Sequence, residues 1–206
     1  MRLLFSALYK TGSVAPGKDG PVLLSAANEL SSFGYFQRGS VREMMAFFAR
    51  TIAKNATPGQ RTSVKEQGYL CHMYVSPMGM TAVCFADSEY PARVAFGYLS
   101  KLCEDFAQAT NGQLSSSSED NCMDATFQAA HLKLLTQFQD PAQADQLTQI
   151  MAELEQTKLV LHETIEAALE RGQKIDDLVA KSNDLSGSSK AFFKTAKKQN
   201  QCCSYM

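Results

Sequence analysis

Two adjacent cysteines, Cys202 and Cys203, are the residues of this 206-residue sequence best suited to chemistry. Cys203 begins the sequence Cys-Ser-Tyr-Met, which matches the C-a-a-X prenylation pattern, and methionine at its last position favours a farnesyl group. Ser204 and Tyr205 are less aliphatic than is usual at the middle positions. Cys202 offers a second acceptor, for palmitate or for another prenyl group such as geranylgeranyl. The alternative is an unmodified, exposed tail.

A second attachment signal lies in the same tail. One lipid chain binds a membrane only marginally, so stable attachment needs another lipid or a basic patch. The segment 186–206 contains Lys190, Lys194, Lys197 and Lys198 and no acidic residue. No stretch approaches the ~20 apolar residues that a membrane-spanning helix needs. We therefore expect a chain without a signal peptide that attaches to membranes through lipid.

Other motifs indicate no catalysis. The segment 12–18 has G-x-x-x-x-G-K spacing, but Asp19 replaces the magnesium-binding hydroxyl and a strand, not a helix, is predicted to follow. His162-Glu163 begins an H-E-x-x-H pattern that ends in Glu166, and the six cysteines lack zinc-site spacing. The net charge of −1 argues against a dedicated nucleic-acid binder. We expect neither an enzyme nor a metal or cofactor site.

The first part of the chain has mixed periodicity. Apolar runs predict strands at 2–9, 20–27, 61–66, 69–76 and 79–86. Ser40 and Glu43 form a capping box that opens a predicted helix over 40–54, and Pro91 opens another that extends to about 109. After a serine-rich loop at 110–121, a last helix is predicted over 122–139. This order predicts an α+β fold with an antiparallel sheet.

From about residue 143 the apolar positions step by three and four, which predicts one coiled-coil helix about 80 Å long. Gly172 and Gly187 weaken this helix, so we expect it to fold against partners. The apolar positions of its seam are Leu147, Ile150, Leu154, Leu161, Ala168, Ile175, Leu178, Leu185, Phe192 and Ala196.

Arg171 also occupies the seam. A buried arginine needs partners, and neutral amide side chains from other helices could satisfy its five donors and fix the register. Alternatively, the side chain extends out of a loose seam into water. The spacing alone leaves both readings open.

Long stretches of the sequence carry a family resemblance: SSFGYFQRGSV, RTSVKEQGYLCHMYV, LERGQKIDDLV, SKAFFKTAKKQN and CCSYM. Together they resemble the Ykt-type lipidated longin-domain R-SNAREs of the synaptobrevin-like family. The resemblance implies a longin (profilin-like) domain at 1–139, with a five-stranded antiparallel sheet flanked by helices. It also implies an R-SNARE coiled-coil motif at 140–200 and a lipidated tail at 201–206.

The family's function then becomes an expectation for this chain. Arg171 would form the central ionic layer with three glutamines of Q-SNARE helices, and zippering of the four helices would drive vesicle fusion. Further partners would be membranes and the machinery that disassembles SNARE complexes. The expected location is the cytosol and the cytoplasmic face of Golgi, ER–Golgi, endosomal or vacuolar membranes. The alternative is a longin-type trafficking adaptor that bridges proteins without driving fusion.

Two regulatory features are also predicted. The family's longin domain shelters the lipid and the SNARE motif, and Phe47 matches the aromatic residue of its groove; the alternative is that Phe47 is plain core. Ser182 and Ser189 lie in the seam, where a phosphate would add about −1.5 to −2 charge to a tightly packed position. Both serines are therefore candidate phosphosites that would oppose zippering.

Overall fold

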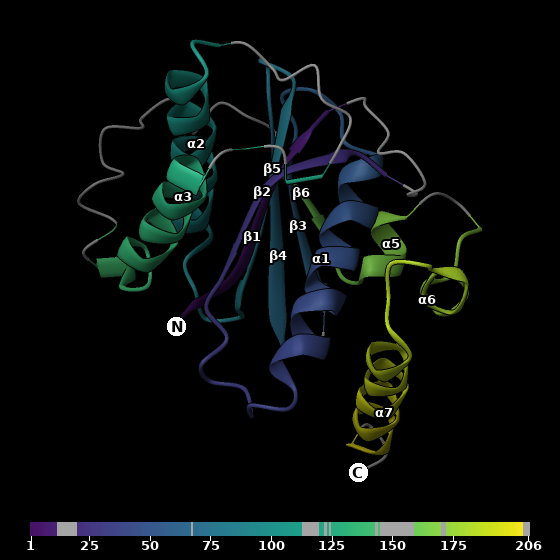
Figure 1. Ribbon diagram of the computed structural model, residues 1–206. Helices are drawn as coiled ribbons and strands as arrows, with labels where there is room; N and C mark the ends of the chain where they lie inside the picture. Colours follow the sequence, from purple (N-terminus) through teal and green to yellow (C-terminus); the bar gives the residue numbers. More distant parts are fainter. Residues whose placement is uncertain are drawn as a thin grey trace.

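The computed structural model describes residues 1–11, 20–66, 68–112, 120–121, 123, 125–142, 144, 159–169 and 172–203, with the backbone alone for 199–203. Figure 1 shows a central sheet with two helices on one face and one helix on the other, and the last part of the chain lying beside that single helix.

The sheet has six strands in the order β2-β1-β5-β4-β3-β6. Five come from the first half of the chain and pair antiparallel, whereas β6 pairs parallel to β3. The central strands are buried on both faces, which explains why they are almost continuously apolar in sequence. The bounds are β1 Leu3–Lys10, β2 Val22–Asn28, β3 Arg61–Glu66, β4 Tyr69–Ser76, β5 Met80–Asp87 and β6 Leu159–His162.

Three helices cover the sheet: α1 Arg38–Lys54 on one face, and α2 Ala92–Ala109 and α3 Ala125–Gln137 on the other. Alternate strand residues divide between two apolar clusters: Leu8 and Cys84 pack with α2 and α3, and Tyr9 and Val83 pack with α1. The α+β class is confirmed, and the five strands predicted from sequence are the first five of the sheet.

The C-terminal region differs from the single long helix predicted over 140–200. Its described part contains β6 and three helices, α5 Ile165–Ala168, α6 Ile175–Lys181 and α7 Gly187–Cys203. Gly172 lies between α5 and α6 with φ of 92°, a left-handed conformation that interrupts a helix. Of the predicted seam, Leu147, Ile150, Leu154 and Arg171 lie outside the described residues.

A buried histidine joins α3 to the sheet. His131 bonds Ser6 Oγ through Nε2 at 3.0 Å and Ser25 Oγ through Nδ1 at 2.8 Å, and Tyr98 Oη lies 3.2 Å from Nε2. Burial lowers the pKa of His131 to about 3, so the ring is neutral at physiological pH. A neutral ring suits this network, because one nitrogen then donates a hydrogen bond and the other accepts one.

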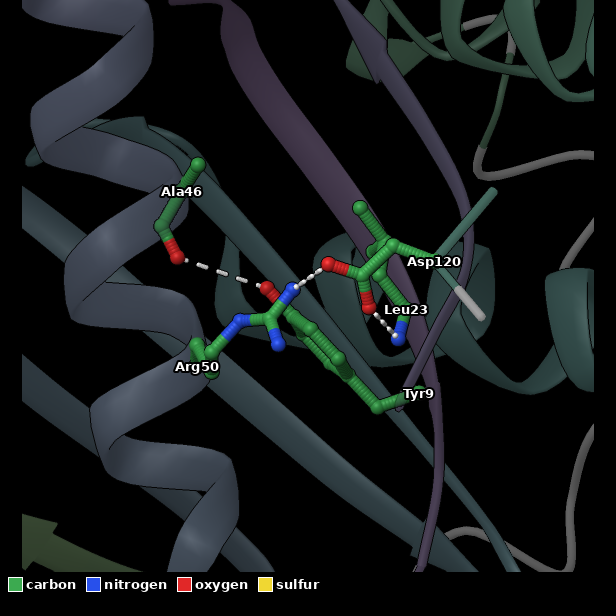
Figure 2. Close-up of polar contacts among 5 residues, drawn as sticks. All are labelled: Tyr9, Leu23, Ala46, Arg50 and Asp120. Carbon is green, nitrogen blue, oxygen red and sulfur yellow. Dashed lines mark hydrogen bonds and ion pairs between the residues drawn. The ribbon is translucent and has the colours of Figure 1, made fainter. Parts of the chain in front are cut away.

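A buried ion pair joins α1 to the edge of the sheet that is formed by β2 (Figure 2). Arg50 Nη2 donates to Asp120 Oδ2 at 2.6 Å, and Asp120 Oδ1 accepts from the Leu23 backbone N–H at 2.9 Å. The Arg50 guanidinium also lies 5.9 Å from the centre of the Tyr9 ring. Because Asp120 belongs to the α2–α3 connection, the pair joins α1 to β2 and to a loop from the other layer.

We predict that Asp120→Ala lowers the free energy of unfolding by about 3 kcal/mol, because it leaves the Arg50 charge buried without its partner. Asp105→Ala is the matched control, since it breaks an exposed pair with Lys101 and should cost less than about 1 kcal/mol. Urea unfolding of both variants measures the difference. Equal losses would contradict the structural role assigned to Asp120.

Candidate functional site

The candidate site is the contact between α1 and the end of the chain. We call the described residues of 159–198 (159–169 and 172–198) the fold-back segment, because after β6 they lie on the outer side of α1. Figure 1 shows α5, α6 and α7 on the same side of the sheet as α1, away from α2 and α3. Two kinds of contact hold the segment: strand pairing at the sheet edge and side-chain packing on α1.

Strand pairing covers the edge of β3. β6 pairs with β3 over four positions, from Arg61↔Leu159 to Val64↔His162. The outward side chains, Leu159 and Leu161, are 51% and 62% exposed. The predicted seam residue Leu161 is therefore not sheltered, although its backbone is paired.

Helix α5 continues from this edge and lies beside α1. Thr164 caps it by accepting a hydrogen bond from the Ala167 backbone N–H. Ile165 is buried, and its backbone N–H donates to Glu66 Oε2 at 3.1 Å. Glu66 belongs to β3, so a side chain of the sheet fixes the point at which the fold-back segment leaves it.

The apolar residues that follow pack against α1. The structure brings five predicted seam residues into the apolar cluster that includes Val41 and Met44 of α1: Ala168, Ile175, Leu178, Leu185 and Phe192. Ile175 and Leu185 are buried, and the other three are half-buried. Ala196 is half-buried but is not part of that cluster. Most of the described seam is therefore covered by the N-terminal domain.

Three buried residues of this contact were missed in the sequence. Ile165, Val179 and Phe193 belong to the same cluster, and the last two each follow a predicted seam residue by one position. Their apolar side chains could have indicated this, but the seam was assigned only from positions spaced by three and four residues. They show that the fold-back segment buries a broader apolar face than a coiled-coil seam does.

Aromatic rings make the contact between α1 and α7. The rings of Phe48 and Phe193 lie 6.0 Å apart, edge to face, and Phe47 stands 5.7 Å from Phe48. Phe47 is half-buried at the side of this contact. Phe48 is the α1 ring that meets α7.

A carboxylate of α1 holds the start of α7. Glu43 Oε2 accepts from the Ser186 backbone N–H at 3.0 Å and from Ser189 Oγ at 2.7 Å. Burial opposes the charge of Glu43, but these bonds outweigh it and lower the pKa of its carboxyl. Ser189 is fully buried, whereas Ser182 is half-buried and accepts from the Asp184 backbone N–H.

The remaining predicted functional residues lie at the C-terminus of α7 or outside the described residues. Cys202 and Cys203 are in the last turn of α7, and their side chains are not described. Arg171 lies outside the described residues altogether. Within the described part of the chain, no cluster of histidine, cysteine or acidic residues could hold a metal ion. No helix in that part is long and apolar enough to cross a membrane.

Comparisons with known proteins agree with this architecture. The sequence profile of the longin family, a regulated-SNARE-like domain, matches residues 30–130, and that of synaptobrevin matches residues 146–205. A VAMP-like protein YKT61 of Arabidopsis thaliana is 43% identical over 93% of this chain and 94% of its own length. Synaptobrevin homologs YKT6 are 39% identical in Candida glabrata, over the full length of both chains, and in Saccharomyces cerevisiae, over 97% and 99%.

We predict that Phe48→Ala releases α7 from α1, because the truncated side chain no longer packs on Phe193. The lost apolar contact is about 1.5 kcal/mol, so amide hydrogen exchange in 187–198 should become roughly tenfold faster, while β1 and β5 stay protected. Phe36→Ala removes the same ring from a 95% exposed position and serves as the control. Unchanged exchange in α7 would contradict the assigned contact.

Proposed function

Because the chain belongs to the longin-domain R-SNAREs of the synaptobrevin family, we propose that its C-terminal segment zippers with three Q-SNARE helices to drive vesicle membrane fusion. We further propose that the N-terminal domain holds this segment back until those partners take it. The observation that carries the proposal is the packing of five predicted seam residues, two buried and three half-buried, in the apolar cluster of the N-terminal domain on the α1 side. Proteins of this family act as SNAREs in vesicle trafficking and not as enzymes.

Competition for one apolar face makes the two states exclusive. A four-helix bundle would bury Ile175, Leu178, Leu185 and Phe192 among partner helices, and the same side chains pack on the N-terminal domain here. A side chain cannot be buried at both places. Zippering also needs a continuous helix. The pairing of β6 with β3 must therefore break, and the residues between α5, α6 and α7 must become helical.

The coupling of folding to binding supplies the work. The segment forms three separate helices on its own domain, and burial of a complete seam among four helices would release more free energy than this contact does. In the bundle, Arg171 would face three glutamines, whose amide oxygens accept from its guanidinium. Disassembly machinery would then return the chain to the closed state.

Membrane attachment completes the proposal. Cys203 would carry a farnesyl group and Cys202 palmitate or a second prenyl group. The exposed side chains of Lys194 and Lys198 on α7 would add attraction to an anionic surface. The chain would then cycle between the cytosol and the cytoplasmic face of Golgi, ER–Golgi, endosomal or vacuolar membranes.

The full chain, mixed with three Q-SNARE motif helices, should form a four-helix complex that resists SDS. Arg171→Glu should abolish this complex, because a carboxylate in the central layer would be buried against amide oxygens. Lys181→Glu makes the same charge change at an exposed position off the seam and should leave the yield unchanged. Absence of a complex with the wild-type chain would favour the trafficking adaptor.

Phosphorylation offers a way to control both states. A phosphate on Ser189 would place about −1.5 to −2 charge beside the Glu43 carboxylate and would remove the hydrogen bond that joins them. The same phosphate would also place a charge in the packed seam of the four-helix bundle and so destabilise it. We propose that phosphorylation at Ser182 and Ser189 opens the fold-back segment and opposes zippering.

The double variant Ser182→Glu/Ser189→Glu should assemble with Q-SNARE helices several-fold more slowly than the wild type, and α7 should exchange amide hydrogens faster. Ser188→Glu, at an exposed neighbouring position, is the control and should leave both rates near those of the wild type. Normal assembly of the double variant would exclude this switch.

A further inference from the structure

The β2–α1 connection presents two aromatic side chains to solvent. Tyr35 and Phe36 are 79% and 95% exposed, more than any other large apolar side chain of the described residues. Their rings lie 5.5 Å apart, edge to face. We call this pair the aromatic tip. Adjacent aromatic rings at such exposure are typical of a surface that binds something outside the chain.

The tip is held in place by its own loop. The Arg38 guanidinium donates to two loop carbonyls, Phe33 O through Nε and Ser31 O through Nη2, each at 3.0 Å. The Phe33 ring lies 6.4 Å from that of Tyr69 on β4, which fixes the loop to the sheet. The Gln37 backbone N–H donates to Gly34 O at 2.8 Å and closes the turn. The rings are thus presented by an ordered support.

Positive charge stands at the base of the tip. Arg38 and Arg42 are exposed, lie one helical turn apart on α1, and line the same surface hollow. Two carboxylates lie nearby: Glu29 lines the same hollow and accepts from the Ser31 backbone N–H, and Glu43 faces the start of α7, where it accepts from Ser186. Aromatic rings with basic residues at their base match the interface of an anionic bilayer, where rings enter the headgroup region and arginines remain among the phosphates.

The position of the tip suits the same partner. In Figure 1 the β2–α1 connection, just before the start of α1, and the C-terminal end of α7 both lie at the lower end of the molecule. The lipidated cysteines of the proposed function follow at that end of α7. A membrane that held this tail would therefore lie at the same end of the molecule as the β2–α1 connection.

We propose that Tyr35 and Phe36 insert into the interface of an anionic membrane and give the N-terminal domain its own membrane contact, separate from the lipidated tail. The inference rests on the proposed function for the presence of a membrane, but the contact itself needs neither lipidation nor Q-SNARE partners. A protein groove would be the competing occupant. The protruding rings and the arginines at their base favour the bilayer.

The sequence contains no tryptophan, so Phe36→Trp in the full, unlipidated chain creates a single fluorescent reporter. With phosphatidylcholine vesicles that contain about 30 mol % phosphatidylserine, its emission should shift to the blue and be quenched by brominated acyl chains. Leu132→Trp, at a 49% exposed position on α3 across the sheet, is the matched control and should show neither effect. Unchanged emission of the Phe36→Trp chain would overturn the proposal and favour a protein occupant.

Flotation measures the contribution of each group. Tyr35→Ser/Phe36→Ser should lower the vesicle-bound fraction at least fivefold, and Arg42→Ala should lower it severalfold in a salt-sensitive way. The double serine variant should still form the four-helix complex at wild-type yield, which separates a failure of this proposal from a failure of the proposed function. Equal flotation of the wild type and the double variant would overturn the proposal.

Discussion

The structure depends on one requirement: the apolar face of the C-terminal segment must be buried. Ile175, Val179, Leu185 and Phe193 are too many large apolar side chains to leave in water, and the glycines at 172 and 187 prevent a stable lone helix. Two surfaces can satisfy the requirement, the outer side of α1 and a bundle of partner helices. When partner helices are absent, the segment packs on α1, which gives the closed architecture described above.

The N-terminal domain meets this requirement with a helix that is apolar on two sides. Helix α1 packs Met44 and Ile52 against the sheet and presents Phe48 to α7. Such a helix needs fixed points, which the buried Arg50–Asp120 pair and the sheet core supply. On this surface the C-terminal segment is divided into β6, α5, α6 and α7.

Sequence periodicity predicted the rigid part better than the adaptable part. The five strands of the N-terminal domain were found because continuous apolar runs such as 79–86 are buried on both faces whatever else binds. The three-four spacing of the C-terminal region suits the proposed four-helix bundle, so it predicted one helix and gave no sign of β6. Val179 and Phe193 were missed for the same reason, because they pack in the apolar cluster of the N-terminal domain from positions outside the seam. The exposed ring of Phe36 was not distinguishable by type from the half-buried ring of Phe48.

The two kinds of contact along the fold-back segment differ in how they can open. β6 is held by backbone pairing to β3, and its loss would expose an unpaired sheet edge, so this part should release as a unit. Helix α7 is held by a ring contact and the Glu43 carboxylate, which can break without disturbing the sheet. Release can therefore begin at α7, which carries the proposed lipid-attachment sites, while β6 keeps the segment on the domain. The segment would then straighten only when partner helices supply the burial that β3 and α1 give up.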